Sequence, residues 1–174
     1  MRPAAILFDF GDTLANEGSE LKDPFGATIS ADLIPGAEEL LRRLHDDGYR
    51  LAIVADSVPG TGRRSYESVL RQHGLTDLID AIATSDEAGA EKPDPAVFRL
   101  ALDRLGIDPT DYGRVVMVGN RVDRDVAGAN RLGLVSVWLR WSPRYHPDLR
   151  PPENRPRFTI DRPLELLDVL ERLE

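Results

Sequence analysis

Acidic side chains follow several short apolar runs of the chain. A lysine lies in the loop that follows a further apolar run, AIAT at residues 81–84. Asp9 ends the run AILF and is followed by Asp12, while Asn120 and Asp125 come after the run VVMV. Lys92 is one of only two lysines in the sequence. Converging carboxylates suit Mg²⁺, which takes oxygen ligands and engages substrate phosphate. An ammonium group beside them would neutralise a carboxylate nucleophile and phosphoryl oxygens.

Alternating apolar runs and helical segments predict how these side chains are positioned. Buried strands are expected at residues 4–10, 51–55, 81–84, 115–118 and 135–139. Helices are expected at residues 36–48, 63–73, 95–105, 122–132 and 163–173. This alternation predicts an α/β fold with a doubly wound, Rossmann-like, parallel five-stranded sheet flanked by helices. Ligands of such sheets bind beyond the carboxyl ends of the strands, where the acids and the lysine are expected to meet.

Length and composition narrow the class of protein. A chain of 174 residues predicts one domain spanning 1–174, with a short insert at 15–34, a proline-rich wrap at 142–163 and a terminal helix at 163–173. A net charge of −8 argues against a general affinity for nucleic acid or an anionic membrane. The absence of cysteine excludes disulfides and thiolate nucleophiles. With neither a membrane-spanning run nor a signal peptide in the sequence, we expect a cytoplasmic protein.

Three segments, in order and spacing, carry a resemblance to a known family. FDFGDTL, EKPDPAVF and VVMVGNRVDRDVAGANRLGL together make the chain similar to the haloacid dehalogenase superfamily over roughly residues 4–139. The resemblance implies that Asp9 is the nucleophile, forming an aspartyl-phosphate with its second oxygen on Mg²⁺. It also implies that Lys92 is the family's catalytic and phosphate-binding lysine. Asp125 and the backbone carbonyl of Gly11 would be further metal ligands.

The first motif departs from the pattern of this family. The family's usual motif is Asp-x-Asp-x-Thr, whose second Asp is the general acid and base, but the matching position here is Gly11. We expect Asp12 to take over that catalytic role, because glycine permits backbone angles that could turn the next side chain inward.

Two other motif positions also differ. The family has Ser or Thr after the second strand, where this chain has Ala55, and Ser57 could bind the phosphoryl group only if the loop bends back. Asn120 stands where the family has an Asp, so a neutral amide oxygen would be the metal ligand at that position.

The space for a substrate-selecting cap is small. Only residues 15–34 are spare between Asp9 and the second strand, which predicts a capless member with an open site. Such members act on larger substrates or close the site with a neighbouring subunit, so a homo-oligomer is one hypothesis.

Four residues near the expected site have no assigned role. Arg63 and Arg64 follow the second strand and could hold a distal phosphate, but solvated surface is the favoured interpretation. Arg140 and Trp141 follow the fifth strand and could stack on a substrate, but packing of the proline-rich wrap is favoured.

Three functions are compatible with these residues. The leading hypothesis is a Mg²⁺-dependent phosphomonoester hydrolase that acts on a small phosphorylated metabolite through an aspartyl-phosphate at Asp9. The second is a haloacid dehalogenase-type hydrolase, which would need an apolar halide pocket. The third is a binding or regulatory module whose chemistry was eroded at positions 11, 55 and 120. The sequence does not identify the substrate.

Overall fold

A parallel β-sheet forms the centre of the molecule, which is described over all residues 1–174 by a computed structural model. Its strands are β1 (Ala5–Phe8), β4 (Leu51–Ala55), β5 (Ala81–Thr84), β6 (Val115–Gly119), β7 (Val135–Leu139) and β8 (Phe158–Ile160). They lie in the order β5-β4-β1-β6-β7-β8, and every neighbouring pair is parallel. The doubly wound α/β fold predicted from the sequence is confirmed.

The sheet has one strand more than the sequence predicts. β8 lies inside the proline-rich segment and pairs with β7 through Val137 opposite Phe158 and Leu139 opposite Ile160. Three residues are too few to show a hydrophobic alternation, and a strand this short forms because β7 offers a free edge with which it can pair. The expected wrap therefore includes an edge strand.

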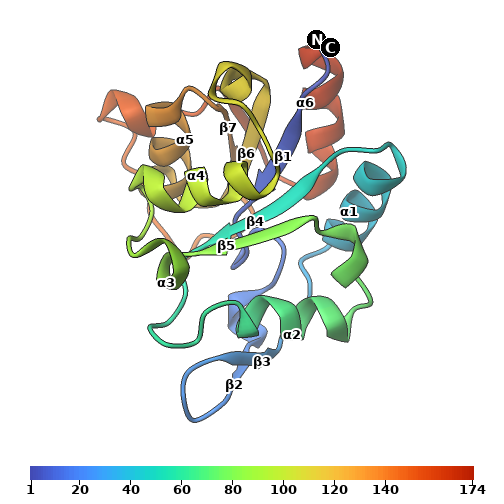
Figure 1. The fold of residues 1–174 in the computed structure, drawn as a ribbon, viewed down its shortest axis with the longest axis vertical. Coiled ribbons are helices and arrows are strands. Elements are labelled where there is room, and N and C mark those ends of the chain that lie inside the picture. The colour runs from blue at the N-terminus through green and yellow to red at the C-terminus, as the bar shows by residue number, and fades with distance from the viewer.

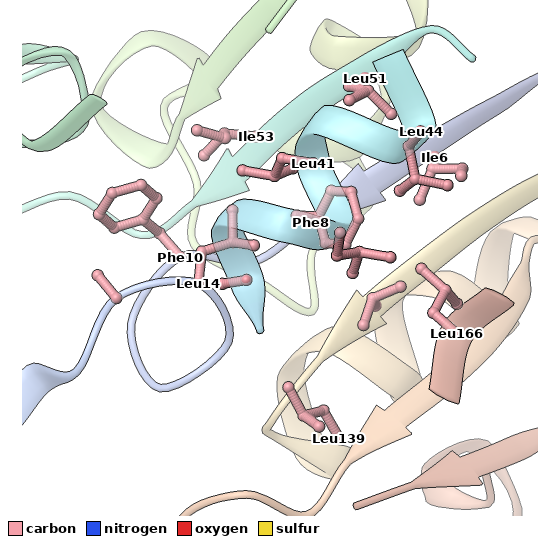
Figure 2. Close-up of a cluster of buried hydrophobic side chains, with 14 of the residues drawn as sticks. Ile6, Phe8, Phe10, Leu14, Leu41, Leu44, Leu51, Ile53, Leu139 and Leu166 are labelled. Carbon is pink, nitrogen blue, oxygen red and sulfur yellow. The ribbon is translucent and has the colours of Figure 1, made fainter. Parts of the chain in front are cut away.

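Helices cover both faces of the sheet (Figure 1). They are α1 (Ala37–Asp46), α2 (Arg64–Gln72), α3 (Ser85–Ala88), α4 (Pro95–Arg104), α5 (Ala127–Leu132) and α6 (Leu166–Leu173). Side chains along β1 alternate between the two faces, Ile6 and Phe8 packing with one buried cluster and Leu7 with the other. Figure 2 shows the first cluster, in which Leu41 and Leu44 of α1 approach Ile6 and Phe8. Burial on both faces explains why the strands read as continuous apolar runs.

The segment predicted as a short insert forms a small antiparallel hairpin. It holds the single turn η1 (Glu17–Ser19) and the strands β2 (Leu21–Lys22) and β3 (Thr28–Ser30). The hairpin is tied to α2 because the hydroxyl of Ser65 accepts a hydrogen bond from the backbone N–H of Thr28 at 2.9 Å. None of the helices combines the length and the apolar character that crossing a membrane would require.

Helices α4 and α5 pack closely where Gly128 of α5 faces the ring of Phe98 of α4. A Cβ atom added at Gly128 would lie 2.3 Å from the ring of Phe98, which is fully buried. Gly128→Ala gains about 1 kcal/mol of helix propensity, but overpacking of a core costs about 1–3 kcal/mol. We expect a net loss of up to about 2 kcal/mol in the free energy of unfolding, measured by urea denaturation.

The control is Gly113→Ala, where an added Cβ meets nothing within 4 Å. That variant should stay within about 0.5 kcal/mol of the parent, as surface substitutions usually do. A Gly128→Ala variant at least as stable as the parent would show that the Phe98 ring moves aside freely.

Candidate active site

A polar cavity of about 250 Å³ opens at the carboxyl ends of the central strands. Its walls include Asp9, Gly11, Lys92, Asn120 and Asp125, which come from three segments far apart in the sequence. The strand ends bring them together because β1 lies between β4 and β6 in the sheet. This is the edge at which open parallel sheets bind ligands.

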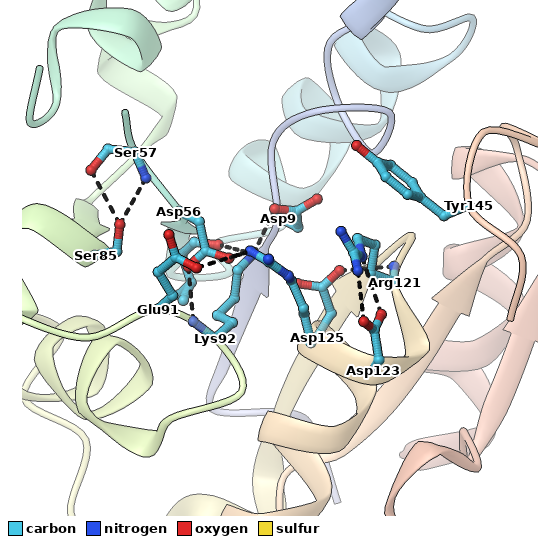
Figure 3. A network of polar contacts seen from close by, with 12 residues as sticks. Asp9, Asp56, Ser57, Ser85, Glu91, Lys92, Arg121, Asp123, Asp125 and Tyr145 are labelled. Atoms are coloured by element: carbon cyan, nitrogen blue, oxygen red, sulfur yellow. Dashed lines mark hydrogen bonds and ion pairs between the residues drawn. The ribbon is translucent and has the colours of Figure 1, made fainter. Parts of the chain in front are cut away.

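The side chain of Lys92 joins two of these acids (Figure 3). Its ammonium group donates to Asp9 Oδ1 at 2.6 Å, to Asp125 Oδ1 at 2.7 Å and to the carbonyl of Val54 at 3.0 Å. These three acceptors use all three hydrogens of an ammonium group. Lys92 is 4% exposed, so its position is fixed by the fold and not by solvent.

The backbone at Lys92 is also anchored. Its N–H donates to Asp56 Oδ1 at 2.8 Å, and the other oxygen of Asp56 accepts from Arg124 at 2.8 Å. Asp56 is the first residue after β4 and lines the cavity. No role was predicted for Asp56 from the sequence, although its place directly after a strand was the available signal.

Asp125 is positioned by a tight π-helical turn, η4 (Val122–Val126). Its Oδ2 accepts from the backbone N–H of Arg121 at 3.0 Å, which leaves Oδ1 directed at Lys92. A Cβ atom at Gly119 would lie 2.3 Å from this carboxylate. Glycine at the end of β6 is therefore what leaves room for the acid.

Burial and charge act together on this cluster. Burial opposes the charged form of Lys92, but the carboxylates of Asp125, Asp9 and Asp56 outweigh it and raise the pKa of the lysine. Burial and the neighbouring charge of Asp9 raise the pKa of Asp125. Two carboxylates share one ammonium group, so the ionised cluster of Asp9, Asp125 and Lys92 carries a net negative charge.

The second oxygen of Asp9 is less enclosed than the first. Asp9 Oδ2 accepts a hydrogen bond from the hydroxyl of Thr13 at 3.1 Å, and the side chain is 13% exposed. A carboxylate held by two donors and still open to the cavity has the position that a nucleophile requires.

Asp12 does not line the cavity. Its side chain is completely buried, with Oδ2 accepting from Arg144 at 2.8 Å and Oδ1 accepting from the backbone N–H of Glu17 at 3.0 Å. The residue with left-handed backbone angles is Asp12 itself, with φ of 50°, and not Gly11 as the sequence analysis assumed. The turn therefore directs Asp12 toward Arg144, and the predicted inward rotation does not occur.

Ser57 is also outside the cavity. Its hydroxyl lies 3.3 Å from that of Ser85 and accepts from the backbone N–H of Asp86 at 3.2 Å. The loop after β4 does not bend back, which was the condition for Ser57 to bind a phosphoryl group. Figure 3 shows Ser57 and Ser85 apart from the group around Lys92. A phosphate-binding role for Ser57 stays a prediction that this geometry does not favour.

Glu17, to which the sequence analysis gave no role, lies on the cavity wall. Its Oε2 accepts from the hydroxyl of Tyr145 at 3.1 Å and forms an ion pair with Arg144 at 3.5 Å. Burial raises the pKa of Glu17, and the charges of Asp12 and Asp9 add to that effect. No sequence signal linked residue 17 with the loop near 145, because the two are adjacent only in the folded chain.

Comparison with known proteins decides the family. The family model described as haloacid dehalogenase-like hydrolase matches residues 17–133. The chain belongs to the haloacid dehalogenase-like hydrolases. The resemblance read from its three motifs is thereby confirmed.

Individual relatives of this chain are phosphatases by name. A glyceraldehyde 3-phosphate phosphatase of Methanopyrus kandleri is 37% identical over 142 residues, covering 82% of this chain and 56% of the relative. The crystal structure of a phosphatase of the superfamily from Thermococcus onnurineus has a TM-score of 0.65 at 32% identity, covering 80% of this chain and 59% of that one. The chain thus spans little more than half the length of these two relatives.

A second solved structure matches along nearly the whole chain. A magnesium-bound hydrolase of the superfamily from Bacillus subtilis has a TM-score of 0.75, covering 98% of this chain and 99% of its own. At 18% identity, this likeness shows a shared fold.

The donor set of this haloacid dehalogenase-like hydrolase fits Mg²⁺. No group of three or more acidic or histidine side chains is arranged to hold a metal ion by itself. Among the residues that line the cavity, the candidate ligands are the carboxylates of Asp9 and Asp125 and the amide of Asn120. Mg²⁺ typically takes one or two carboxylates and completes its shell with water and substrate phosphate. The net negative charge of the cluster also suits a cation. Asp9, Asp125, Asn120 and the carbonyl of Gly11 are the residues that would hold it.

The arginines and the tryptophan without an assigned role do not line the cavity. Arg64 pairs with Asp23, and Arg63 lies 3.6 Å from Glu87. Arg140 pairs with Asp161 at 2.8 Å, while Trp141 packs against the hydrophobic core. The interpretations as surface and as packing residues agree with these contacts. Arg121 and Arg124, which the sequence analysis did not single out, do line the cavity.

Proposed function

We propose that this protein is a Mg²⁺-dependent phosphomonoester hydrolase that acts on a small phosphorylated metabolite through an aspartyl-phosphate on Asp9. The observation that carries the proposal is the ammonium group of Lys92, which contacts both Asp9 and Asp125 inside one cavity. The M. kandleri relative, named for a three-carbon phosphate ester, supports the substrate class.

The side chains divide the work of phosphoryl transfer. One oxygen of Asp9 attacks phosphorus, while Thr13 and Lys92 hold the carboxylate in position. Lys92 neutralises charge that develops on the phosphoryl oxygens, a stabilisation that is strongest in a site shielded from water. When bound, Mg²⁺ supplies further charge neutralisation to the same oxygens. Water then releases phosphate from Asp9, and the carboxylate is restored.

Two competing functions differ from this one in what they need from the site. A dehalogenase would use an apolar halide pocket, whereas the walls of this cavity are mostly polar and charged. A binding module would not need its nucleophile held by a lysine. The contacts of Lys92 therefore favour the hydrolase over both alternatives.

Metal removal tests the proposal. We expect the purified protein to release nitrophenol from 4-nitrophenyl phosphate in the presence of Mg²⁺, to lose that activity in excess EDTA, and to recover it when Mg²⁺ is restored. The reason is that the ionised cluster of Asp9, Asp125 and Lys92 carries a net negative charge. A bound cation would supply the positive charge that the phosphoryl oxygens require. Initial rates by absorbance are the measurement.

Other results would point elsewhere. Release of halide from a 2-haloacid in the presence of EDTA, without phosphatase activity, would favour the dehalogenase chemistry, because the ester to carbon needs no metal. Activity on neither substrate, in a folded preparation with Mg²⁺, would favour a binding module. An aryl phosphatase activity that resists EDTA would contradict the proposed metal dependence.

A further inference from the structure

We propose that Glu17 is the general acid and base of this site, a role that the sequence predicts for Asp12. The assignment rests on the proposed phosphatase function and adds the group that moves the proton. It is carried by three observations: the position of the Glu17 carboxylate, its free oxygen, and the contacts that hold it.

The carboxylate of Glu17 occupies the space in front of Gly11. A Cβ atom built on Gly11 would lie 2.5 Å from Glu17 Oε1 and 2.8 Å from its Cγ. The side chain of Glu17 therefore fills the place where a side chain at position 11 would begin. Because Gly11 is two residues beyond Asp9 and both line the cavity, the carboxylate lies on the wall next to the nucleophile.

Glu17 also has an oxygen available for a substrate. Its Oε2 accepts from Tyr145, whereas Oε1, the atom nearest to Gly11, makes no hydrogen bond within the protein. The other acids that line the cavity with Asp9 are engaged, since Asp125 accepts from Lys92 and Arg121, and Asp56 accepts from Lys92 and Arg124. Glu20 forms an ion pair with Lys22. Asp12, fully buried against Arg144, has no access to the cavity.

Contacts from two segments hold Glu17 in this place. Asn16 caps the turn η1 by accepting from the backbone N–H of Gly18 at 2.9 Å, and Asp12 accepts from the backbone N–H of Glu17. Tyr145 and Arg144 reach the carboxylate from the loop after β7. Asp12 is thus a positioning residue, which acts on the reaction through Glu17.

The proton transfers balance in both half-reactions. As Asp9 forms its bond to phosphorus, the bond from phosphorus to the ester oxygen breaks, and the protonated carboxyl of Glu17 gives its proton to the leaving oxygen, which departs as an alcohol. In the second step a water oxygen attacks phosphorus and the bond to Asp9 breaks. The proton of that water passes to the Glu17 carboxylate, which restores the acid for the next cycle.

The test compares leaving groups, because an alkoxide needs protonation and a nitrophenolate needs little. Glu17→Gln should lower kcat/KM for an alkyl phosphate such as glycerol 3-phosphate by ~10²–10⁴-fold. For 4-nitrophenyl phosphate the fall in kcat/KM should be less than about tenfold, since this constant reports the step that expels the leaving group. Thermal melting shows whether each variant is folded.

Glu20→Gln is the matched control. Glu20 lines the same cavity three residues further on and pairs with Lys22 at 3.1 Å, outside the contacts of Asp9. In Glu20→Gln, kcat/KM for the alkyl phosphate and kcat/KM for the aryl phosphate should change by the same factor. Tyr145→Phe removes only the hydroxyl that donates to Glu17. This second variant tests the proposal if Glu17→Gln does not fold. It should lower kcat/KM for the alkyl phosphate more than kcat/KM for the aryl phosphate.

Two results would overturn the assignment while leaving the phosphatase intact. One is an equal loss on both substrates in folded Glu17→Gln; the other is a leaving-group dependence larger in Asp12→Asn than in Glu17→Gln. A parent protein that hydrolyses neither ester would instead overturn the proposed function, and the role of Glu17 with it.

Discussion

Asp9→Asn should reduce phosphatase activity to the background rate. A carboxamide is a poor nucleophile and a poor ligand for Mg²⁺, so both the covalent step and the metal site are lost. We expect a fall of ~10⁴–10⁶-fold in kcat, the scale seen when the nucleophile of a covalent mechanism is removed. Turnover of 4-nitrophenyl phosphate in excess Mg²⁺ is the measurement.

The fold should survive this change. Asp9 and Asp125 share the one ammonium group of Lys92, so neutralising Asp9 leaves a balanced pair in the cavity. The melting temperature should therefore not fall. Asp123→Asn is the control, because that acid pairs with Arg121 beside the site, has a side chain that is 51% exposed, and should keep its activity within about twofold. An Asp9→Asn preparation, free of parent protein, that retains turnover would rule out the phosphoenzyme.

Lys92→Arg should be severely impaired although it keeps the positive charge. The ammonium group has three acceptors within 3.0 Å, from two side chains and one carbonyl, in a space that leaves the residue 4% exposed. A guanidinium group is larger and planar, and its donors form a rigid fork, so it cannot reach the same three atoms. We expect kcat to fall by ~10²-fold or more, as when one donor to developing charge is lost.

The free energy of unfolding of Lys92→Arg separates an electrostatic effect of the substitution from a steric one. Forcing extra volume into this buried space should cost about 1–3 kcal/mol in the free energy of unfolding. The other lysine supplies the control: Lys22→Arg makes the same substitution at a side chain that is 49% exposed and should change neither activity nor stability appreciably. Parental activity in Lys92→Arg would mean that the contacts of the Lys92 ammonium group with Asp9 and Asp125 are not needed for turnover. The motif match at Lys92 would then lose much of its force.

Much of the scaffold was predictable because its signals are local. The apolar runs at Leu51–Ala55 and Val115–Gly119 are strands in the structure, and Asp94 caps α4 with Pro95 at its first position, as the sequence indicated. Both faces of these strands are covered, so their apolar runs were continuous and easy to recognise. β8 and the β2–β3 hairpin were not predicted, because strands of two or three residues depend on a neighbour for pairing.

The sequence by itself determined which acids lie at the ends of the strands, since Asp9, Asp56 and Asp125 each follow an apolar run in a fold whose strand ends must meet. Tertiary structure alone decided which of the remaining groups face the cavity. Whether Asp12 turns inward depends on Arg144, which lies 132 positions away and holds the buried carboxylate of Asp12 in an ion pair. The same loop brings Tyr145 to Glu17, so the carboxylate that fills the space in front of Gly11 comes from a residue that no local pattern marks. Pairs so distant in the chain leave no periodic signal, because their energy arises only when the folded backbone places them within hydrogen-bond distance.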